Sequence, residues 1–184
     1  AAPERIELWG GEPFVYWAKL KRLVPALAEK FPEVRFSIIT NGSLLNREKL
    51  DFIARYDIGI GLSHDGPGQH VRGPDPLEDP EKRRWIETLL AERPGKVSIN
   101  TVLTRENHSI EAIATWFRDR LGKDVPLALE GVVNTYDAAT LLGSGAFDED
   151  DLRHLSDEVF YPLANDPNAF GLGERLNGFI RSLV

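Results

Sequence analysis

The polar residues that could do chemistry follow three apolar segments in the first half of the chain. The first segment ends in Trp9-Gly10-Gly11-Glu12-Pro13, where two glycines allow a ligand to approach the backbone and Glu12 could bind an ammonium group. The second ends in Thr40-Asn41-Gly42 and the third in Ser63-His64-Asp65-Gly66-Pro67. A serine hydroxyl can donate to a carboxylate, and an aspartate can accept from a hydroxyl or an ammonium group. The first two segments are also common turn sequences, so a plain turn and a ligand site both stay open there.

Three further polar residues allow two interpretations each. Arg72, in the loop before Gly73-Pro74, could bind a carboxylate or phosphate through its planar guanidinium, or it could be solvated. Asn100 lies in an apolar segment, where an amide is costly without a partner, so it either lines a site or bonds a neighbouring strand. Glu130 is either a site carboxylate or the outward residue of an alternating edge strand.

Two familiar kinds of site are disfavoured by spacing. Ser63, His64 and Asp65 are adjacent, and successive residues of a strand point to opposite faces, so they cannot align as a hydrolytic triad. The four histidines do not have the spacing of a metal motif, and we interpret His108 and His154 as structural or solvated.

The elements that must position these residues alternate between strands and helices. The hydrophobic pattern predicts strands over 5–9, 34–39, 57–62, 96–103 and 126–133, and helices over 14–31, 46–56, 80–92, 109–121, 148–163 and 173–184. Pro25 is expected to bend the first helix or to mark a second helix start. Such alternation predicts parallel strands with right-handed crossovers, in an open doubly wound sheet or in part of a β/α barrel. Both architectures place chemistry at the carboxyl ends of strands.

Composition excludes several classes of protein. The 184 residues include 22 Lys+Arg and 29 Asp+Glu, and the net charge of −7 argues against a nucleic-acid or membrane-surface binder. No apolar run approaches the roughly 18 residues of a membrane span. The absence of cysteine excludes disulfides and thiolate-held metals within this chain. The absence of methionine leads us to expect that the chain was cut from a longer one.

Together, the three segments resemble the core of the radical S-adenosylmethionine (radical SAM) superfamily, most closely its SPASM-type, peptide-modifying and sulfatase-maturing branch. The resemblance rests on 9–13, 39–42, 62–67 and the Arg72-Gly73 that follows, in this order and spacing, and covers about residues 5 to 75. It implies an α/β fold, a partial (β/α)6 TIM-like barrel that begins at what would be its second strand. The whole of 1–184 would then be a core fragment, with β/α units over 1–135 and a helical continuation over 136–184.

The resemblance also implies cofactors, partners and binding residues. The whole enzyme would bind S-adenosylmethionine (SAM) and a 4Fe-4S cluster, cleave SAM reductively to a 5′-deoxyadenosyl radical, and modify a peptide or protein. A reductant such as flavodoxin or ferredoxin and a cytoplasmic location follow, with no nucleic-acid or membrane partner. By similarity, the Gly10–Pro13 segment meets the methionine ammonium, Ser63 the carboxylate, Asn100 the ribose or carboxylate, and the backbone near Val132 and Val133 the adenine. The cofactor-binding residues implied are Gly10, Gly11, Glu12, Pro13, Asn41, Ser63, Arg72, Asn100, Val132 and Val133; Asp65 is expected to organise its own turn.

The chain departs from the family pattern in its cysteines. The family holds its cluster with a Cys-x3-Cys-x2-Cys loop after the first strand, and this chain has no cysteine, so we expect that loop upstream of Ala1 and any cysteine-rich region beyond Val184. The main alternative is a degenerate, non-catalytic barrel domain that binds a nucleotide or a partner protein. A third hypothesis is a hydrolase that uses Glu12 and Asp65. His64 stands where the family is usually apolar; pointing outward it changes little, and pointing inward it could touch substrate.

Overall fold

The computed structural model describes residues 2–105, 107–132, 149–157 and 161–166. It is an α/β chain with one five-stranded sheet, in which the strands lie side by side in the order in which they occur in the sequence. The strands are β1 (Arg5–Leu8), β2 (Arg35–Thr40), β3 (Gly59–Ser63), β4 (Val97–Leu103) and β5 (Leu127–Val132). The pairs β1–β2, β2–β3 and β4–β5 are parallel, as the alternation of strands and helices predicts.

Helices occupy the predicted gaps between the strands. The longer ones are α1 (Trp17–Lys30), α2 (Arg47–Arg55), α4 (Pro80–Glu92) and α5 (Ile110–Leu121), and the short ones are η1 (Pro13–Tyr16), η2 (Gly66–Gly68), α3 (Gln69–Arg72), α7 (Glu149–Leu155) and α8 (Tyr161–Asn165). Of the helix predicted over 148–163, the structure describes α7 and the first residues of α8, with 158–160 outside the described part, and the helix predicted over 173–184 lies wholly outside it. The segment expected to be a loop after β3 is helical from Gly66 to Arg72.

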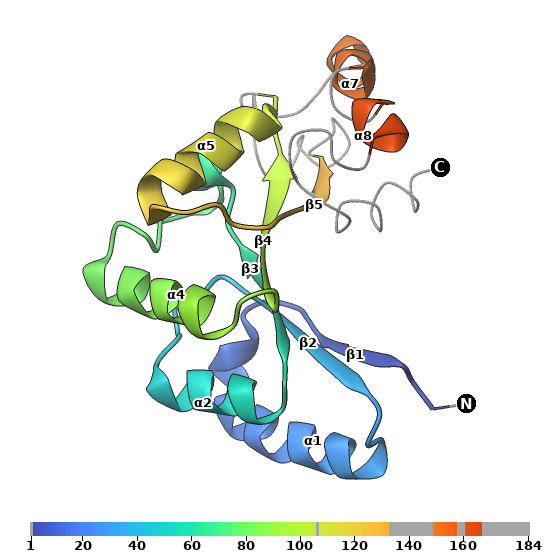
Figure 1. Cartoon of the computed structure of the whole chain (residues 1–184), viewed down its shortest axis with the longest axis vertical. Helices are drawn as coiled ribbons and strands as arrows, with labels where there is room; N and C mark the ends of the chain where they lie inside the picture. The colour runs from blue at the N-terminus through green and yellow to red at the C-terminus, as the bar shows by residue number, and fades with distance from the viewer. Residues whose placement is uncertain (1, 106, 133–148, 158–160, 167–184) are drawn as a thin grey trace. The chain divides into compact units, whose positions relative to one another are not determined.

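The chain divides into two compact units, which we describe separately. The first unit comprises Ala1–Ser63 and Asp75–Ser98. In it α1, α2 and α4 lie on one side of β1–β3 (Figure 1). Its core is aliphatic and fully buried at Val24, Ile38, Ile53 and Ile86.

Local signals fix the helix boundaries of the first unit. The Asn46 side chain accepts from the backbone N of Lys49 and caps α2, as predicted, and Asp79 caps α4 in the same way. Pro25 lies inside α1, which continues through it, so the second helix start that Pro25 also allowed does not occur.

The second unit comprises His64–Pro74 and Ile99–Val184. Here α5 packs its Ile113 and Phe117, both fully buried, into a core with Ile99, Leu103 and Leu127 of the strands. Ser109 caps the start of α5 through its side chain, and Gly122 ends the helix at a φ of +67°.

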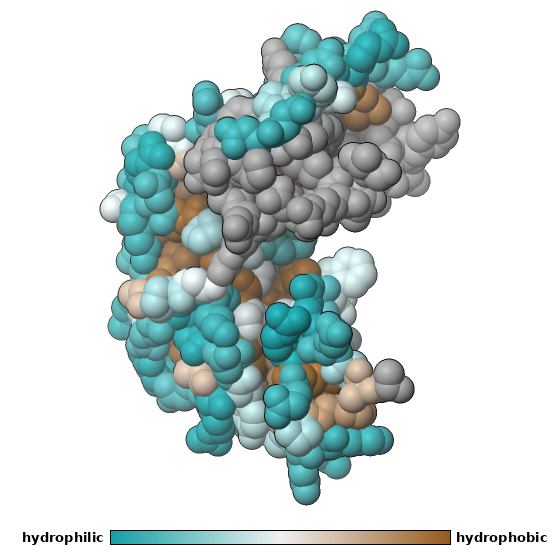
Figure 2. Space-filling view, turned by 45° about the vertical axis from the view of Figure 1, so that its right-hand side comes forward, coloured by the Kyte–Doolittle hydropathy of each residue, from teal (hydrophilic) through white to brown (hydrophobic). Residues whose placement is uncertain are grey.

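The face of the molecule that Figure 2 shows is largely hydrophilic where it is described. Charged and polar residues cover most of the described surface that Figure 2 shows, with hydrophobic residues visible between them. Within the described parts of the chain, no helix combines the length and the apolar character that crossing a bilayer requires.

Candidate functional site

The turn after β1 depends on glycine for its backbone shape. Gly10 has a φ of +111° and Gly11 a φ of +57°, and the first of these lies outside the left-handed helical region that other residues reach at moderate cost. A Cβ built on either glycine meets no atom within 4 Å. The backbone angle therefore requires glycine at position 10 and favours it at position 11, and no described residue fills the space beside them.

Glu12 follows that turn and is held in one orientation by three donors. Its Oε1 accepts from Phe14 N at 3.1 Å and from Thr40 Oγ1 at 2.8 Å, and its Oε2 accepts from Asn41 N at 2.8 Å. A carboxylate has about four acceptor positions. Among the described residues, one acceptor position on Oε2 has no donor, so an ammonium group could bind there without displacing a protein contact.

Two residues that the resemblance did not assign to the site, Thr40 and Lys49, interact with Glu12, the second through its charge. Thr40 is buried and donates to it. Lys49, on α2, lies with its Nζ 5.9 Å from the centre of the Phe14 ring and 5.5 Å from that of Trp17. Burial lowers the pKa of the Lys49 ammonium below its ordinary value of 10.5, and the charges of Glu48 and Glu12 act in the opposite direction. The position of Thr40 at a strand end was a usable signal, whereas nothing in the sequence around Lys49 pointed to Glu12.

Asn41 uses its side chain within its own turn. Its Oδ1 accepts from Ser43 N at 2.9 Å, the local bond that makes asparagine a turn residue. It reaches Glu12 through its backbone N alone. Ser63, the last residue of β3, is half-buried at the end of that strand.

Asp65, in the second unit, is a buried hub. Its carboxylate forms a two-pronged ion pair with Arg72, with distances of 2.8 Å to Nε and 2.9 Å to Nη2. Its Oδ1 also accepts from Val102 N at 2.9 Å, and its backbone oxygen accepts from Asn107 Nδ2 at 2.7 Å. The backbone pairing with β4 continues one residue beyond β3, where His64 N donates to Asn100 O. The Asp65 carboxylate then accepts from Val102 N, further along β4. The Asp65 carboxylate thus links α3 to β4. It makes no capping hydrogen bond to η2, so the expectation that it organises its own turn stays a prediction.

Arg72 is the other half of that ion pair. Its side chain is 30% exposed against 8% for Asp65. Its guanidinium is not simply solvated, because Nε and Nη2 both donate to the Asp65 carboxylate. A ligand role for Arg72 stays a prediction.

His64 has no exposed surface and packs against the aromatic residues of α5. Its ring centre lies 5.4 Å from that of Trp116 and 5.1 Å from that of Phe117. Its Nδ1 accepts from Gly66 N at 3.0 Å. The ring therefore faces the helix layer, which is the outward alternative of the two that the sequence allowed.

Asn100 and Glu130 bond to each other across β4 and β5. Asn100 Nδ2 donates to Glu130 Oε1 at 2.5 Å. The pairing register shifts between Thr101 and Val102, which leaves Glu130 as an extra residue in β5. Asn100 thus bonds a neighbouring strand, and its cofactor role stays a prediction. Val132 is the last residue of β5, and Val133 lies outside the described residues.

No family model matches the chain. A curated protein, the radical SAM cyclopropyl synthase TigE of Paramaledivibacter caminithermalis, is 27% identical over 106 residues, which is 55% of this chain and 22% of that protein.

Solved structures share the fold more broadly. Polyhistidine-tagged anSMEcpe with bound AdoMet (SAM) aligns with 92% of this chain and 49% of its own at a TM-score of 0.63 and 18% identity. Native anSMEcpe with bound AdoMet and the Cp18Cys peptide aligns at a TM-score of 0.62 and 19% identity, over 90% of this chain and 49% of its own. A radical SAM methyltransferase from Sphaerobacter thermophilus aligns at a TM-score of 0.59 and 17% identity, over 92% of this chain and 49% of its own. The chain thus has the α/β fold of radical SAM enzymes, consistent with the expected partial barrel, and spans about half the length of these structures.

The residues present do not fit an iron–sulfur cluster. The chain has no cysteine, and the described residues contain no group of three or more His, Asp or Glu side chains that could hold a metal ion. Such clusters are held chiefly by cysteine thiolates. The chain therefore supplies no thiolate ligand for such a cluster.

Proposed function

We propose that this chain is the SAM-binding core of a radical SAM enzyme of the peptide-modifying, SPASM-type branch. The observation that carries the proposal is the fixed carboxylate of Glu12 beside two glycines with open space around them. The likeness to TigE and to AdoMet-bound anSMEcpe supports the same assignment.

Glu12 is suited to bind the methionine ammonium of SAM. Three protein donors hold its carboxylate, so it loses little further freedom when a ligand binds. The open position on Oε2 accepts one ammonium hydrogen, and backbone carbonyls of the Gly10–Pro13 segment accept others. Binding at this turn leaves the hydrogen bonds of β2 intact.

We assign the other parts of SAM to the remaining candidates. The Ser63 hydroxyl donates to the methionine carboxylate, Asn100 meets the ribose, and the backbone near Val132 and Val133 flanks the adenine. Asn41 contributes by holding Glu12, and Arg72 binds the carboxylate only if it leaves Asp65.

SAM supplies a 5′-deoxyadenosyl radical when it is cleaved reductively in enzymes of this superfamily. Because this chain does not contain cluster ligands, we assign to it the binding and orientation of SAM and not the delivery of the electron. For the whole protein we propose a peptide or protein substrate, since one neighbour was solved with a bound peptide. A small redox protein as reductant and a cytoplasmic location complete the proposal.

Calorimetric titration with SAM and with 5′-methylthioadenosine tests the assignment, because the second ligand lacks the amino-acid part. We expect Glu12→Gln to weaken SAM about tenfold or more, as expected when a charge-assisted bond is lost, and to leave 5′-methylthioadenosine unchanged. Glu7→Gln, the same change on an exposed strand residue, is the control. Equal losses for both ligands, or no loss for SAM, contradict the role of Glu12.

A further inference from the structure

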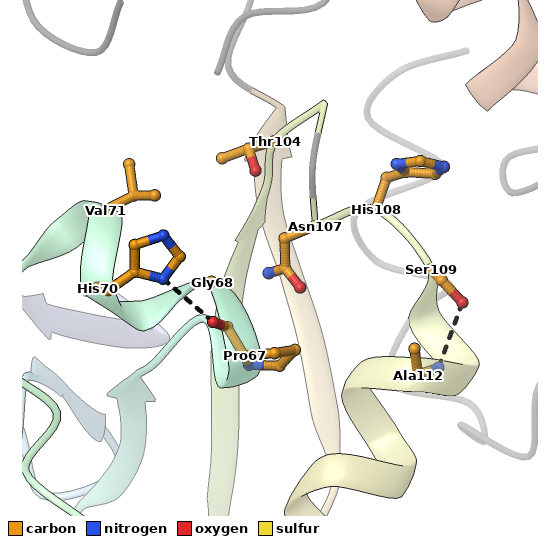
Figure 3. A pocket seen from close by; sticks show the side chains of 9 residues that line it. All are labelled: Pro67, Gly68, His70, Val71, Thr104, Asn107, His108, Ser109 and Ala112. Carbon is orange, nitrogen blue, oxygen red and sulfur yellow. Dashed lines mark hydrogen bonds between the residues drawn. The ribbon is translucent and has the colours of Figure 1, made fainter. Parts of the chain in front are cut away.

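A small cavity in the second unit has a polar lining that the SAM proposal does not use. Its volume is about 290 Å³, and it is lined by residues of the η2–α3 segment and of the segment that joins β4 to α5 (Figure 3). The lining residues are Pro67, Gly68, His70, Val71, Thr104, Asn107, His108, Ser109 and Ala112. This volume is at the lower end of small-ligand sites, so it suits one side chain or one peptide unit and not a nucleotide.

Asn107 presents an acceptor to this cavity. The residue is only 8% exposed, and its Nδ2 is committed to the Asp65 backbone oxygen at 2.7 Å, which fixes the orientation of the amide. Among the described residues, no donor reaches Asn107 Oδ1. A ligand N–H that enters the cavity would give this oxygen a donor.

Thr104 presents a hydroxyl to the same cavity. It is 6% exposed, and its backbone N and O are both paired with those of Asn107, at 3.3 and 3.0 Å. Within the described chain, its Oγ1 has no hydrogen-bond partner. The hydroxyl can donate to a ligand carbonyl, and the short backbone bridge keeps it at a fixed place relative to the Asn107 acceptor.

His70 and Ser109 add to the polar lining. His70 Nδ1 lies 3.2 Å from Pro67 O, and because a carbonyl only accepts, Nδ1 carries the hydrogen of this bond and Nε2 is left for a ligand. The His70 ring lies on the side of α3 that faces Thr104 and Asn107 (Figure 3). Ser109 Oγ accepts from Ala112 N at 3.3 Å and keeps its own hydrogen for a ligand.

We propose that this cavity binds an amide group, the peptide unit or carboxamide side chain of a peptide. An amide offers the N–H that Asn107 Oδ1 lacks and the C=O that the Thr104 hydroxyl can donate to. An anion would meet the Asn107 oxygen, which repels it. As a docking site for the enzyme's substrate the cavity rests on the proposed function, but amide binding itself does not.

The test is a titration of the ¹⁵N-labelled chain, followed by NMR, with N-methylacetamide and with methyl acetate, which replaces the N–H by an oxygen. We expect N-methylacetamide to shift the resonances of 67–71 and 107–112 saturably, and methyl acetate to bind about three- to tenfold more weakly, the effect of one hydrogen bond. Thr104→Val should weaken N-methylacetamide by a similar factor, and Ala112→Leu should block it. Thr115→Val, on an exposed face of α5 that does not line the cavity, should change nothing.

Three results would overturn the proposal. The first is equal affinity for methyl acetate and N-methylacetamide, the second is tighter binding of the acetate anion, titrated in the same way, than of N-methylacetamide, and the third is no saturable shift at these residues. A SAM titration of the same sample separates the two proposals. If the chain binds the amide but not SAM, the cavity assignment stands and the proposed function is wrong. If it binds SAM but not the amide, only the cavity assignment is wrong.

Discussion

Asp65→Asn tests whether the buried hub holds the second unit together. Asparagine keeps Oδ1 for Val102 N and Arg72 Nη2 but replaces Oδ2 with an NH2 group, which then faces the N–H of Arg72 Nε. Neutralising one partner of a buried ion pair costs about 3–5 kcal/mol. Because the Arg72 side chain is 30% exposed and can reach water, we expect a smaller loss than that, about 2–3 kcal/mol.

Asp57→Asn is the matched control for this substitution. Asp57 also pairs with two cationic side chains, Arg93 at 2.5 Å and Lys96 at 2.6 Å, but it is 64% exposed. Its φ of +48° is one that asparagine tolerates. We expect a loss below about 1 kcal/mol in the free energy of unfolding, measured by urea titration. Equal losses at the two positions would refute the claim that burial makes the Asp65 pair important.

Three further predictions concern single groups. Gly10→Ala should destabilise the chain by about 1–3 kcal/mol and Gly11→Ala by less, since only a φ of +111° lies outside the left-handed region; equal thermal shifts would contradict this. The salt bridges of Asp57 lower its pKa below the ordinary 3.8, so its stabilising effect should be full above that pH and disappear as pH falls through the lower folded pKa. The free energies of unfolding of wild type and Asp57→Asn, measured by urea titration, should therefore converge at low pH. A difference between them that does not change with pH would contradict this. Gly68→Ala should cost about 1–3 kcal/mol in urea titration, because its Cβ would lie 2.5 Å from Asn107 Nδ2; an unchanged unfolding midpoint would contradict that crowding.

The order of strands and helices was predictable because its signals are local. Apolar runs marked all five strands, and the helices predicted to begin at 46 and 109 begin within a residue of those positions. Gly122 marked the end of α5 for the same reason, since a left-handed residue is most easily a glycine. These signals act over a few residues, so one sequence suffices to interpret them.

The partners of the site residues were not predictable, because they come from distant parts of the chain. Glu12 meets Thr40 across 28 positions and Asp65 meets Val102 across 37. The sequence showed carboxylates at strand ends, but not that one keeps an open acceptor position while the other is occupied by Arg72. The bulge at Glu130 was equally hidden, since register is a property of two strands together.

A crystal structure of this chain soaked with SAM tests the central claim most directly. The account predicts the methionine ammonium within hydrogen-bond distance, about 2.7–3.2 Å, of Glu12 Oε2, with Thr40 and Asn41 still bonded to the same carboxylate. SAM bound with its ammonium away from Glu12, or no bound SAM at concentrations at which calorimetry detects binding, would contradict it.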